Sequence, residues 1–386
     1  MANIIDYLEW RGDIPFSVDG FNEVDNLILS ELSYTDFGDI VPGPEEKKKI
    51  SAREVCDRFF AIHSEEEIMA KKSTTKVAPF LLPYLAESRR FGKMQLLGYV
   101  NEVDKETQSQ FSVVTFALED GTNFVAFRGT DSTIVGWKED FNMSFLYQTH
   151  GQMQAAAYLD RCFKRSRKKL RIGGHSKGGN FAVYAASFCH PTVQNKIIEV
   201  YSNDGPGFSD NVTESEGYKR ILPKVISTIP EYSIVGMLLK NELNHRVVVS
   251  SQTGAMQHDL MSWEVMGNHM VYATGLSNSS IMLDQTLKRW IYGLEPEKRE
   301  EFVNILFDTL QSTGAQTIDD LKNNKLEVIN EITKSLSNLP ADRQQAVKEV
   351  LIRFVFSGGE TLAGNAGDLW SKTERFLKRH KIKLKE

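Results

Sequence analysis

Cysteine is scarce in this 386-residue chain, which contains only Cys56, Cys162 and Cys189. The three lie far apart and lack the spacing of a metal site, and an odd number fits a reducing compartment better than a disulfide framework. We therefore expect neither a disulfide scaffold nor a cysteine-ligated metal centre.

Long apolar runs are also missing, since none reaches the roughly 18 residues that a membrane span requires. The first residues lack the basic and apolar regions of a secretory signal. A net charge of -5 gives no sign of a nucleic-acid partner. We interpret the basic clusters at 161–171 and 378–385 as a solvated helix end and tail. These features predict a cytoplasmic protein without a transmembrane segment, and they leave peripheral membrane contact open.

The periodicity of apolar residues divides the chain into three parts. Residues 1–90 are mostly helical in pattern, residues 91–285 contain the strands, and residues 286–386 return to helical spacing. The predicted strands are 94–100, 111–118, 123–127, 170–173, 197–202, 225–229 and 247–250. Helices alternate with the later strands, a pattern typical of an α/β fold with a mostly parallel central sheet flanked by helices. We expect the N-terminal segment to pack on this core and residues 286–386 to form a helical extension with apolar faces at Phe302, Ile305, Leu306 and Leu310 and at 347–355.

The segment Gly174-His175-Ser176-Lys177-Gly178 lies between a predicted strand and a predicted helix. A strand, a sharp turn and a helix are the context in which a Gly-x-Ser-x-Gly motif exposes a nucleophilic serine. The glycines provide room for the close approach of neighbouring backbone. The pattern predicts that Ser176 is a nucleophile.

Such a serine needs a histidine to take its proton and a carboxylate to orient that histidine. His258 follows the last predicted strand after a short loop, and we prefer it to His245, before that strand, and His269, in a predicted helix. For the acid, Asp204 follows the strand at 197–202 directly, and Glu231 follows the next strand. Both residues remain candidates for the acid, and we prefer Asp204. Asp259, adjacent to His258, would normally point elsewhere.

Acyl transfer also needs donors for the negative oxygen that develops on the substrate. The backbone N–H of Lys177, the residue after the serine, is one donor by geometry. The loop Arg128-Gly129-Thr130 follows the strand at 123–127 and offers a second donor through the N–H or hydroxyl of Thr130.

Together, Val125-Ala126-Phe127-Arg128-Gly129-Thr130, Trp137, Asp140 and Gly174-His175-Ser176-Lys177-Gly178-Gly179 resemble the α/β-hydrolases of the class 3 lipase type over about residues 90–275. The helix that begins at Phe21-Asn22-Glu23-Val24 resembles the opening of an uncharacterised bacterial branch of this group. The resemblance implies an α/β-hydrolase fold, Ser176 as nucleophile, Thr130 and Lys177 as oxyanion donors, and a histidine in the final loop, which Gln257-His258-Asp259 supplies.

The chain departs from the lipase pattern at two positions. Lys177 replaces the usual leucine, which favours an anionic substrate unless the side chain points to solvent. Ser233-Ile234-Val235-Gly236 stands where the group usually has Asp-x-Val-Pro. The acid has therefore moved to Asp204 or Glu231, or has been lost.

The sequence thus predicts an esterase- or lipase-like serine hydrolase that cleaves a small-molecule or lipid ester through an acyl-enzyme on Ser176. No metal and no organic cofactor is required. Residues 208–222, or the helices after 285, are candidates for a lid. The alternative is a catalytically weak or inactive ligand- or protein-binding module on the same fold, and a third reading is acyl transfer to an acceptor other than water. The oligomeric state stays open.

Overall fold

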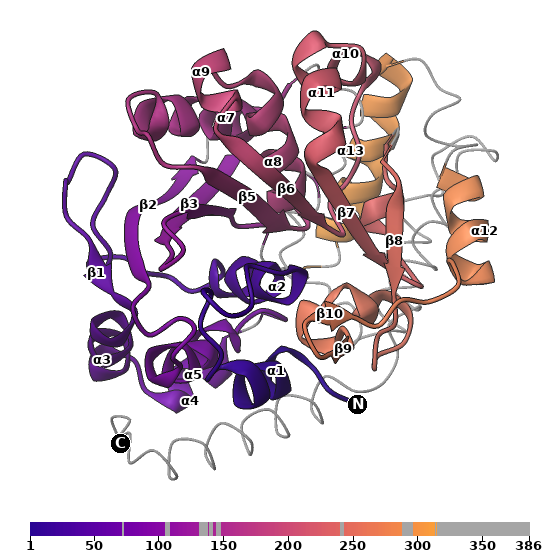
Figure 1. Cartoon of the computed structure of the whole chain (residues 1–386). Helices are drawn as coiled ribbons and strands as arrows, with labels where there is room; N and C mark the ends of the chain where they lie inside the picture. The colour runs from indigo at the N-terminus through magenta and orange to yellow at the C-terminus, as the bar shows by residue number, and fades with distance from the viewer. Residues whose placement is uncertain are drawn as a thin grey trace.

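A computed structural model gives the structure of the chain (Figure 1). It describes residues 1–71, 73–104, 109–130, 138, 142–143, 148–239, 243–287, 296–312 and 314. The predicted helical face at 347–355 therefore lies outside the described residues, as do Trp137 and Asp140.

An eight-stranded sheet forms the centre, with its strands in the order of the sequence. The strands are β1 (Ile50–Ser51), β2 (Gln95–Asp104), β3 (Ser109–Ala117), β4 (Asn123–Phe127), β5 (Leu170–His175), β6 (Ile197–Asn203), β7 (Val225–Pro230) and β8 (His245–Val248). The pairings from β1 to β4 are antiparallel, and those from β4 to β8 are parallel. Short turns join antiparallel strands, whereas parallel strands need crossover connections.

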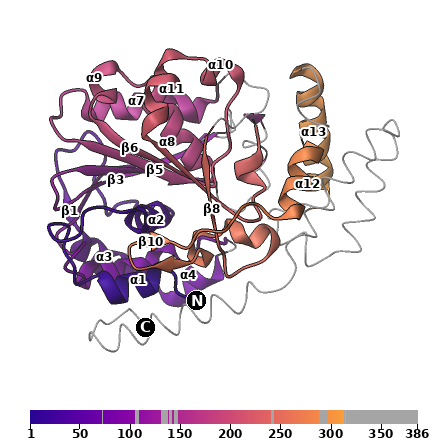
Figure 2. The ribbon, with the colours of Figure 1, turned by 45° about the vertical axis from the view of Figure 1, so that its right-hand side comes forward.

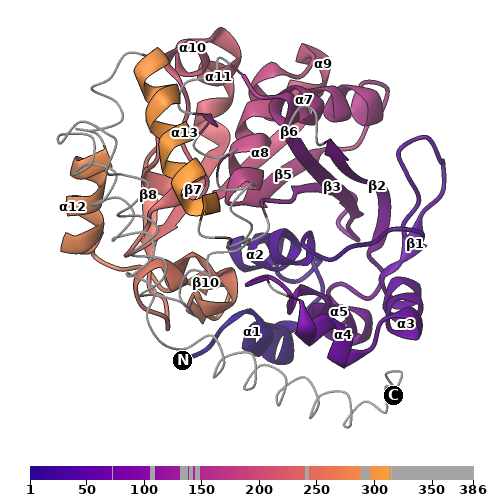
Figure 3. The same cartoon turned by 180° about the vertical axis from the view of Figure 1, so that it is seen from behind.

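The crossovers contain α7 (His150–Phe163), α8 (Lys177–Phe188), α9 (Pro191–Gln194), α10 (Asp210–Thr213), α11 (Glu216–Ile221) and the short η2 (Leu222–Lys224). In Figures 1 and 3, α7 and α8 lie on the opposite side of the sheet from α2 (Glu23–Leu32). Strand alternation explains the two layers, because successive side chains of a strand face opposite sides. On β4, Val125 and Phe127 join the core under α7 and α8, while Phe124 and Ala126 join the core under α2. This architecture confirms the predicted fold class.

The N-terminal residues form α1 (Ile4–Arg11), α2, α3 (Ala52–Ile62), α4 (Glu65–Ala70), η1 (Ala78–Phe80) and α5 (Leu81–Glu87). Asn3 and Asn22 begin α1 and α2 with capping boxes, in which the third residue of the helix returns a hydrogen bond. The predicted apolar stripe of α2 is buried at Val24, Leu27 and Ile28. These helices share one hydrophobic cluster with the sheet, so the segment packs directly on the core.

The segment after β8 contains η4 (Gly254–His258), η5 (Leu260–Ser262), a β9–β10 hairpin (Val265–Met266 and His269–Met270), α12 (Asn278–Leu287) and α13 (Pro296–Ser312). His269 therefore lies in a hairpin strand, and the helix expected there was wrong. Figure 2 shows α12 and α13 at the β8 side of the sheet. On α13, Val303, Phe307 and Leu310 are buried, and Ile305 packs partly buried against the same core. Leu310 and Ile305 of the predicted face are therefore on the packed side, and the side chains of Phe302 and Leu306 lie outside the described residues. No helix in the described part of the chain is long and apolar enough to cross a membrane.

A buried ion pair fixes α2 to the segment before β2. Arg90 donates from Nε and Nη2 to the two carboxylate oxygens of Asp25, at 2.7 and 2.5 Å, and both side chains are fully buried. The remaining guanidinium hydrogens reach the carbonyl oxygens of Ile14, Asp19 and Gly20. With all donors satisfied, the pair specifies where α2 lies.

We expect Arg90→Met to lower the free energy of unfolding by about 3–5 kcal/mol, because it leaves a buried carboxylate and three carbonyl groups without their donor. The matched control is Arg53→Met, which removes an exposed pair with Glu87 and should cost less than about 1 kcal/mol. Urea unfolding of both variants measures the difference, and equal losses would contradict the assignment.

Candidate active site

Ser176 occupies a strained turn between β5 and α8. Its backbone angles are φ 56° and ψ −132°, in a region that residues other than glycine rarely adopt. A Cβ atom on Gly174 would lie 2.4 Å from the backbone of Gly178, and one on Gly178 would lie 2.1 Å from the carbonyl oxygen of Phe127. The two glycines of the motif are therefore required by close packing, which holds the serine at the carboxyl end of β5.

Asp204 follows β6 and also has a positive φ, of 47°. It is fully buried, and its Oδ1 accepts hydrogen bonds from the Ser233 hydroxyl at 2.5 Å and the Gly236 backbone N–H at 3.1 Å. Ser233 and Gly236 belong to the segment where the lipase pattern has its acid. In this chain that segment supplies donors, and the carboxylate comes from the neighbouring strand.

His258 ends η4, in the loop after β8, and its Nδ1 lies 2.6 Å from Oδ2 of Asp204. The loop is held by Gln257, whose side-chain oxygen accepts from the N–H of Tyr232 and whose carbonyl accepts from the indole of Trp263. About 22% of the His258 side chain is exposed. The structure thus brings His258 and Asp204 together.

The other candidates occupy different places. His245 is the first residue of β8 rather than preceding it, and its Nδ1 lies 2.9 Å from the hydroxyl of Ser227. His269 is exposed in the hairpin. Glu231 contributes its backbone to hydrogen bonds with Val248 and Ser277. The Nδ1 position that Glu231 would need on His258 is taken by Asp204.

The loop after β4 approaches the serine closely. A Cβ atom on Gly129 would lie 3.0 Å from Cβ of Ser176 and 2.5 Å from the carbonyl oxygen of His175. The hydroxyl oxygen of Thr130 is buried and has no hydrogen-bond partner within the residues that the structure describes. A buried donor without a partner is costly, so this hydroxyl is suited to a ligand oxygen.

Lys177 is the first residue of α8, so its backbone N–H lies at the positive end of the helix dipole. Its side chain is buried, with Nζ 5.7 Å from the centroid of the Phe181 ring. The reading in which this side chain points to solvent was therefore wrong.

Sequence reasoning overlooked His175, the variable residue of the motif. Its side chain is buried, with Nδ1 2.8 Å from the Tyr34 hydroxyl and Nε2 2.8 Å from the carbonyl oxygen of His258. Burial, and then the positive charge that His258 can carry, hold the pKa of His175 well below its ordinary 6.5. The ring is therefore neutral near pH 7. The motif alone gave no partner for it, because Tyr34 lies 141 residues earlier.

Two carboxyl groups interact electrostatically, the fully buried Glu31 of α2 and the half-buried Asp259 beside His258. Burial, and then the charge of Asp259, raise the pKa of Glu31 well above its ordinary value. Burial raises the pKa of Asp259 to about 6. The Asp259 carboxylate accepts from the N–H of Met261 at 2.9 Å.

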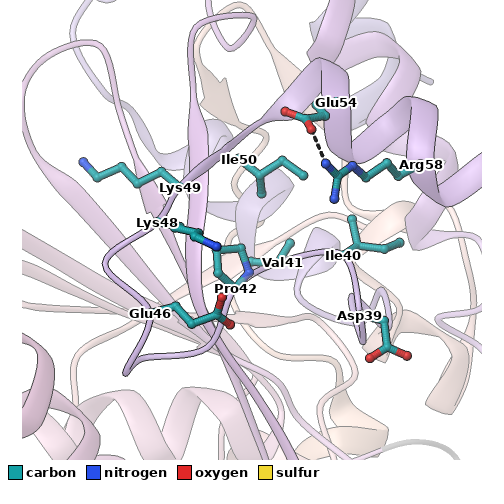
Figure 4. A pocket seen from close by; sticks show the side chains of 10 residues that line it. All are labelled: Asp39, Ile40, Val41, Pro42, Glu46, Lys48, Lys49, Ile50, Glu54 and Arg58. Carbon is teal, nitrogen blue, oxygen red and sulfur yellow. Dashed lines mark hydrogen bonds and ion pairs between the residues drawn. The ribbon is translucent and has the colours of Figure 1, made fainter.

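Figure 4 shows a pocket of about 510 Å³ on the N-terminal segment, lined by Asp39, Ile40, Val41, Pro42, Glu46, Lys48, Lys49, Ile50, Glu54 and Arg58. It contains none of the predicted site residues, and its Arg58 is paired with Glu54. Within the described residues, no group of three or more His, Cys, Asp and Glu side chains could hold a metal ion.

The strand–serine–helix turn, with an acid after the next strand and a histidine after the last parallel strand, is the arrangement of an α/β-hydrolase. A model of the Mbeg1-like family matches residues 85–308. None of the curated proteins matches the sequence.

Several solved lipase structures are similar. The M37 lipase has 16% identity and a TM-score of 0.34, over 55% of this chain and 69% of that chain. The lipase Lip2 from Yarrowia lipolytica has 13% identity and a TM-score of 0.31, over 50% of this chain and 76% of that chain. The Rhizomucor miehei lipase–propeptide complex has 16% identity and a TM-score of 0.29, over 40% of this chain, which spans 57% of the lipase chain. At these identities and TM-scores the likeness says nothing about the reaction.

Because the native pKa of His175 is depressed, the unfolded state takes up a proton at this residue first as the pH falls. The stability contributed by the neutral ring is complete above about pH 6.5 and is lost below it, by at most about 1.4 kcal/mol per pH unit. We therefore expect His175→Gln to be less stable than the wild type at about pH 7.5, with the difference shrinking towards about pH 5. Urea unfolding at several pH values tests this, and a pH-independent difference would contradict it.

Proposed function

This chain belongs to the Mbeg1-like family, and we propose that it is a serine hydrolase of the esterase or lipase type, which cleaves carboxylic esters through an acyl-enzyme on Ser176. The observation that carries the proposal is the 2.6 Å contact between His258 Nδ1 and Asp204 Oδ2. The loop of His258 is hydrogen-bonded to His175, the residue before Ser176 in its strained turn. This combination is what activates a serine hydroxyl.

In the proposed reaction, the Asp204 carboxylate accepts a hydrogen bond from Nδ1–H of His258, which leaves the Nε2 lone pair free to act as base. His258 removes the hydroxyl proton of Ser176 as the serine oxygen attacks the acyl carbon, and then protonates the leaving alcohol. Asp204 stabilises the imidazolium that forms in between. Its Oδ1 keeps the hydrogen bonds from Ser233 and Gly236, so the carboxylate stays oriented through both steps.

Two donors are proposed for the tetrahedral intermediate, the backbone N–H of Lys177 and the hydroxyl of Thr130. Lys177 starts α8, and Thr130 follows Gly129, which approaches Ser176 closely. The buried hydroxyl of Thr130 supports this role, because it has no hydrogen-bond partner within the described residues and an oxyanion would supply one. Water then attacks the acyl-enzyme by the same proton transfers.

The proposed substrate is a small-molecule or lipid ester. Its acyl part would bind apolar side chains in the layer that contains α13. Phe208 and Leu238 share one buried cluster with Val303 and Phe307 of α13. Ser176 exposes only 4% of its surface, and we propose that covering side chains move when a substrate enters. We propose α13 as part of this cover.

The burial of Ser176 also favours a second candidate, a ligand- or protein-binding module with little catalysis. In that case the His258–Asp204 pair would serve only to hold the loop after β8.

A fluorophosphonate probe separates the two candidates, because it modifies only an activated serine. We expect the wild-type protein to be labelled and to hydrolyse p-nitrophenyl butyrate, and Ser176→Ala to do neither. Circular dichroism confirms that each sample is folded. A folded wild type that is neither labelled nor active would favour the binding module.

The choice of acid is tested with a matched pair of amides. Asp204→Asn should lower kcat by about 10⁴, because the amide cannot stabilise the imidazolium and favours the wrong ring tautomer. Glu231→Gln makes the same chemical change on the carboxylate that does not contact His258, and should leave kcat within about twofold of wild type. Equal losses in the two variants would overturn the assignment of Asp204.

A further inference from the structure

Helix α2 buries polar side chains against the sheet, which needs an explanation because unpaired polar groups are costly there. Asn26 and Ser30 are fully buried, and Tyr34 follows the helix at the same four-residue spacing. Residues four apart lie on one face of a helix. This polar face points at the candidate active site from the opposite side of the sheet to α8.

The first contacts of this face are with the turn before Asp204. Asn26 and Asn203 exchange amide hydrogen bonds at 2.9 and 3.2 Å, and Asn203 also donates to the Ser30 hydroxyl at 3.2 Å. The carbonyl of Asn203 in turn accepts from the N–H of Ser176 at 2.9 Å. The middle of α2 is thus tied to the turns that carry the proposed acid and the proposed nucleophile.

Tyr34, the last residue of this face, is linked to the proposed base His258 by hydrogen bonds through His175. The carbonyl oxygen of His258 can only accept a hydrogen bond, so Nε2 of His175 carries the ring proton and donates it at 2.8 Å. Nδ1 of the same neutral ring is then an acceptor, and the Tyr34 hydroxyl donates to it at 2.8 Å. The rings of His175 and His258 lie side by side, with centroids 4.3 Å apart.

We propose that Tyr34 is a positioning residue for catalysis, which satisfies Nδ1 of the Nε2–H tautomer of His175 and thereby helps this ring to hold the backbone of His258 against the nucleophile turn. The inference rests on the proposed function. Without the phenol hydroxyl, Nδ1 of the buried His175 loses its donor. The buried ring then has an unsatisfied acceptor, so it is held less firmly in the position from which Nε2–H donates to the His258 carbonyl. A base that is less well held reacts more slowly while the substrate still binds.

The same hydroxyl also touches the oxyanion loop. A Cβ atom on Gly129 would lie 2.3 Å from the Tyr34 hydroxyl oxygen, so the loop packs directly on it. Tyr34 therefore stands between the loop of the proposed oxyanion donor Thr130 and the ring that holds the proposed base. The residue lies before the region 85–308 that the family model matches, so this support comes from the N-terminal segment.

The test is Tyr34→Phe in the full chain, which removes one oxygen atom and keeps the ring. We expect kcat for p-nitrophenyl butyrate and the rate of fluorophosphonate labelling to fall about tenfold, with KM within about twofold of wild type, since one neutral hydrogen bond with a buried acceptor is lost. A general loss of stability lowers the amount of protein that is labelled, whereas the proposed role lowers the labelling rate constant of the folded protein at constant KM.

The matched control is Tyr7→Phe. Tyr7 is a buried tyrosine whose hydroxyl donates to Asp25 at 3.0 Å and accepts from Asn22 at 2.9 Å, at the other end of α2. Its loss should reduce stability and leave kcat unchanged. Equal kcat in Tyr34→Phe and wild type, or equal losses in the two variants, would overturn the role of Tyr34. If the wild type itself is not labelled, the proposed function fails instead, so the two failures are distinguishable.

Discussion

The site depends on a crowded stretch of backbone between β5 and α8. Gly174 and Gly178 approach each other and the end of β4 so closely that no side chain fits, and this contact fixes Ser176 at a positive φ. The strain is sustained because the strands on both sides are paired and the flanking helix is buried. Everything else in the site is arranged around this turn. The β4 loop approaches from one neighbouring strand, and Asp204 comes from the other.

The position of Asp204 illustrates that, in a parallel sheet, equivalent side chains can be supplied by neighbouring strands. The ends of β6 and β7 are adjacent, so a side chain after either strand can reach the same space. In this chain the aspartate follows β6, and Ser233 after β7 donates to it. The imidazole still receives a buried carboxylate, with two donors holding its second oxygen. In the proposed triad, the carboxylate is therefore supplied from the end of β6 in place of the end of β7.

The N-terminal segment is joined to the site through polar contacts as well as through the apolar core. The Arg90–Asp25 pair sets the position of α2, and Asn26 and Tyr34 extend from that helix to the turns beside Asp204 and Ser176. Because these groups are buried, each lost partner costs more than it would at the surface. Correct placement of α2 is therefore coupled energetically to the geometry at the carboxyl ends of β5 and β6.

The sequence by itself determined the alternation of strands and helices, the elbow at Ser176 and the preference for His258, because these depend on local spacing and on residues with specific chemistry. The strand at Asn123–Phe127 was predicted at its exact bounds. The hairpin at His269, the buried face of α13, the side chain of Lys177 and the partners of His175 were decided by the tertiary structure. So was the choice between Asp204 and Glu231 as neighbour of His258. Each of these features depends on which segments, far apart in the sequence, pack together. The spacing of apolar residues along the chain does not specify those contacts.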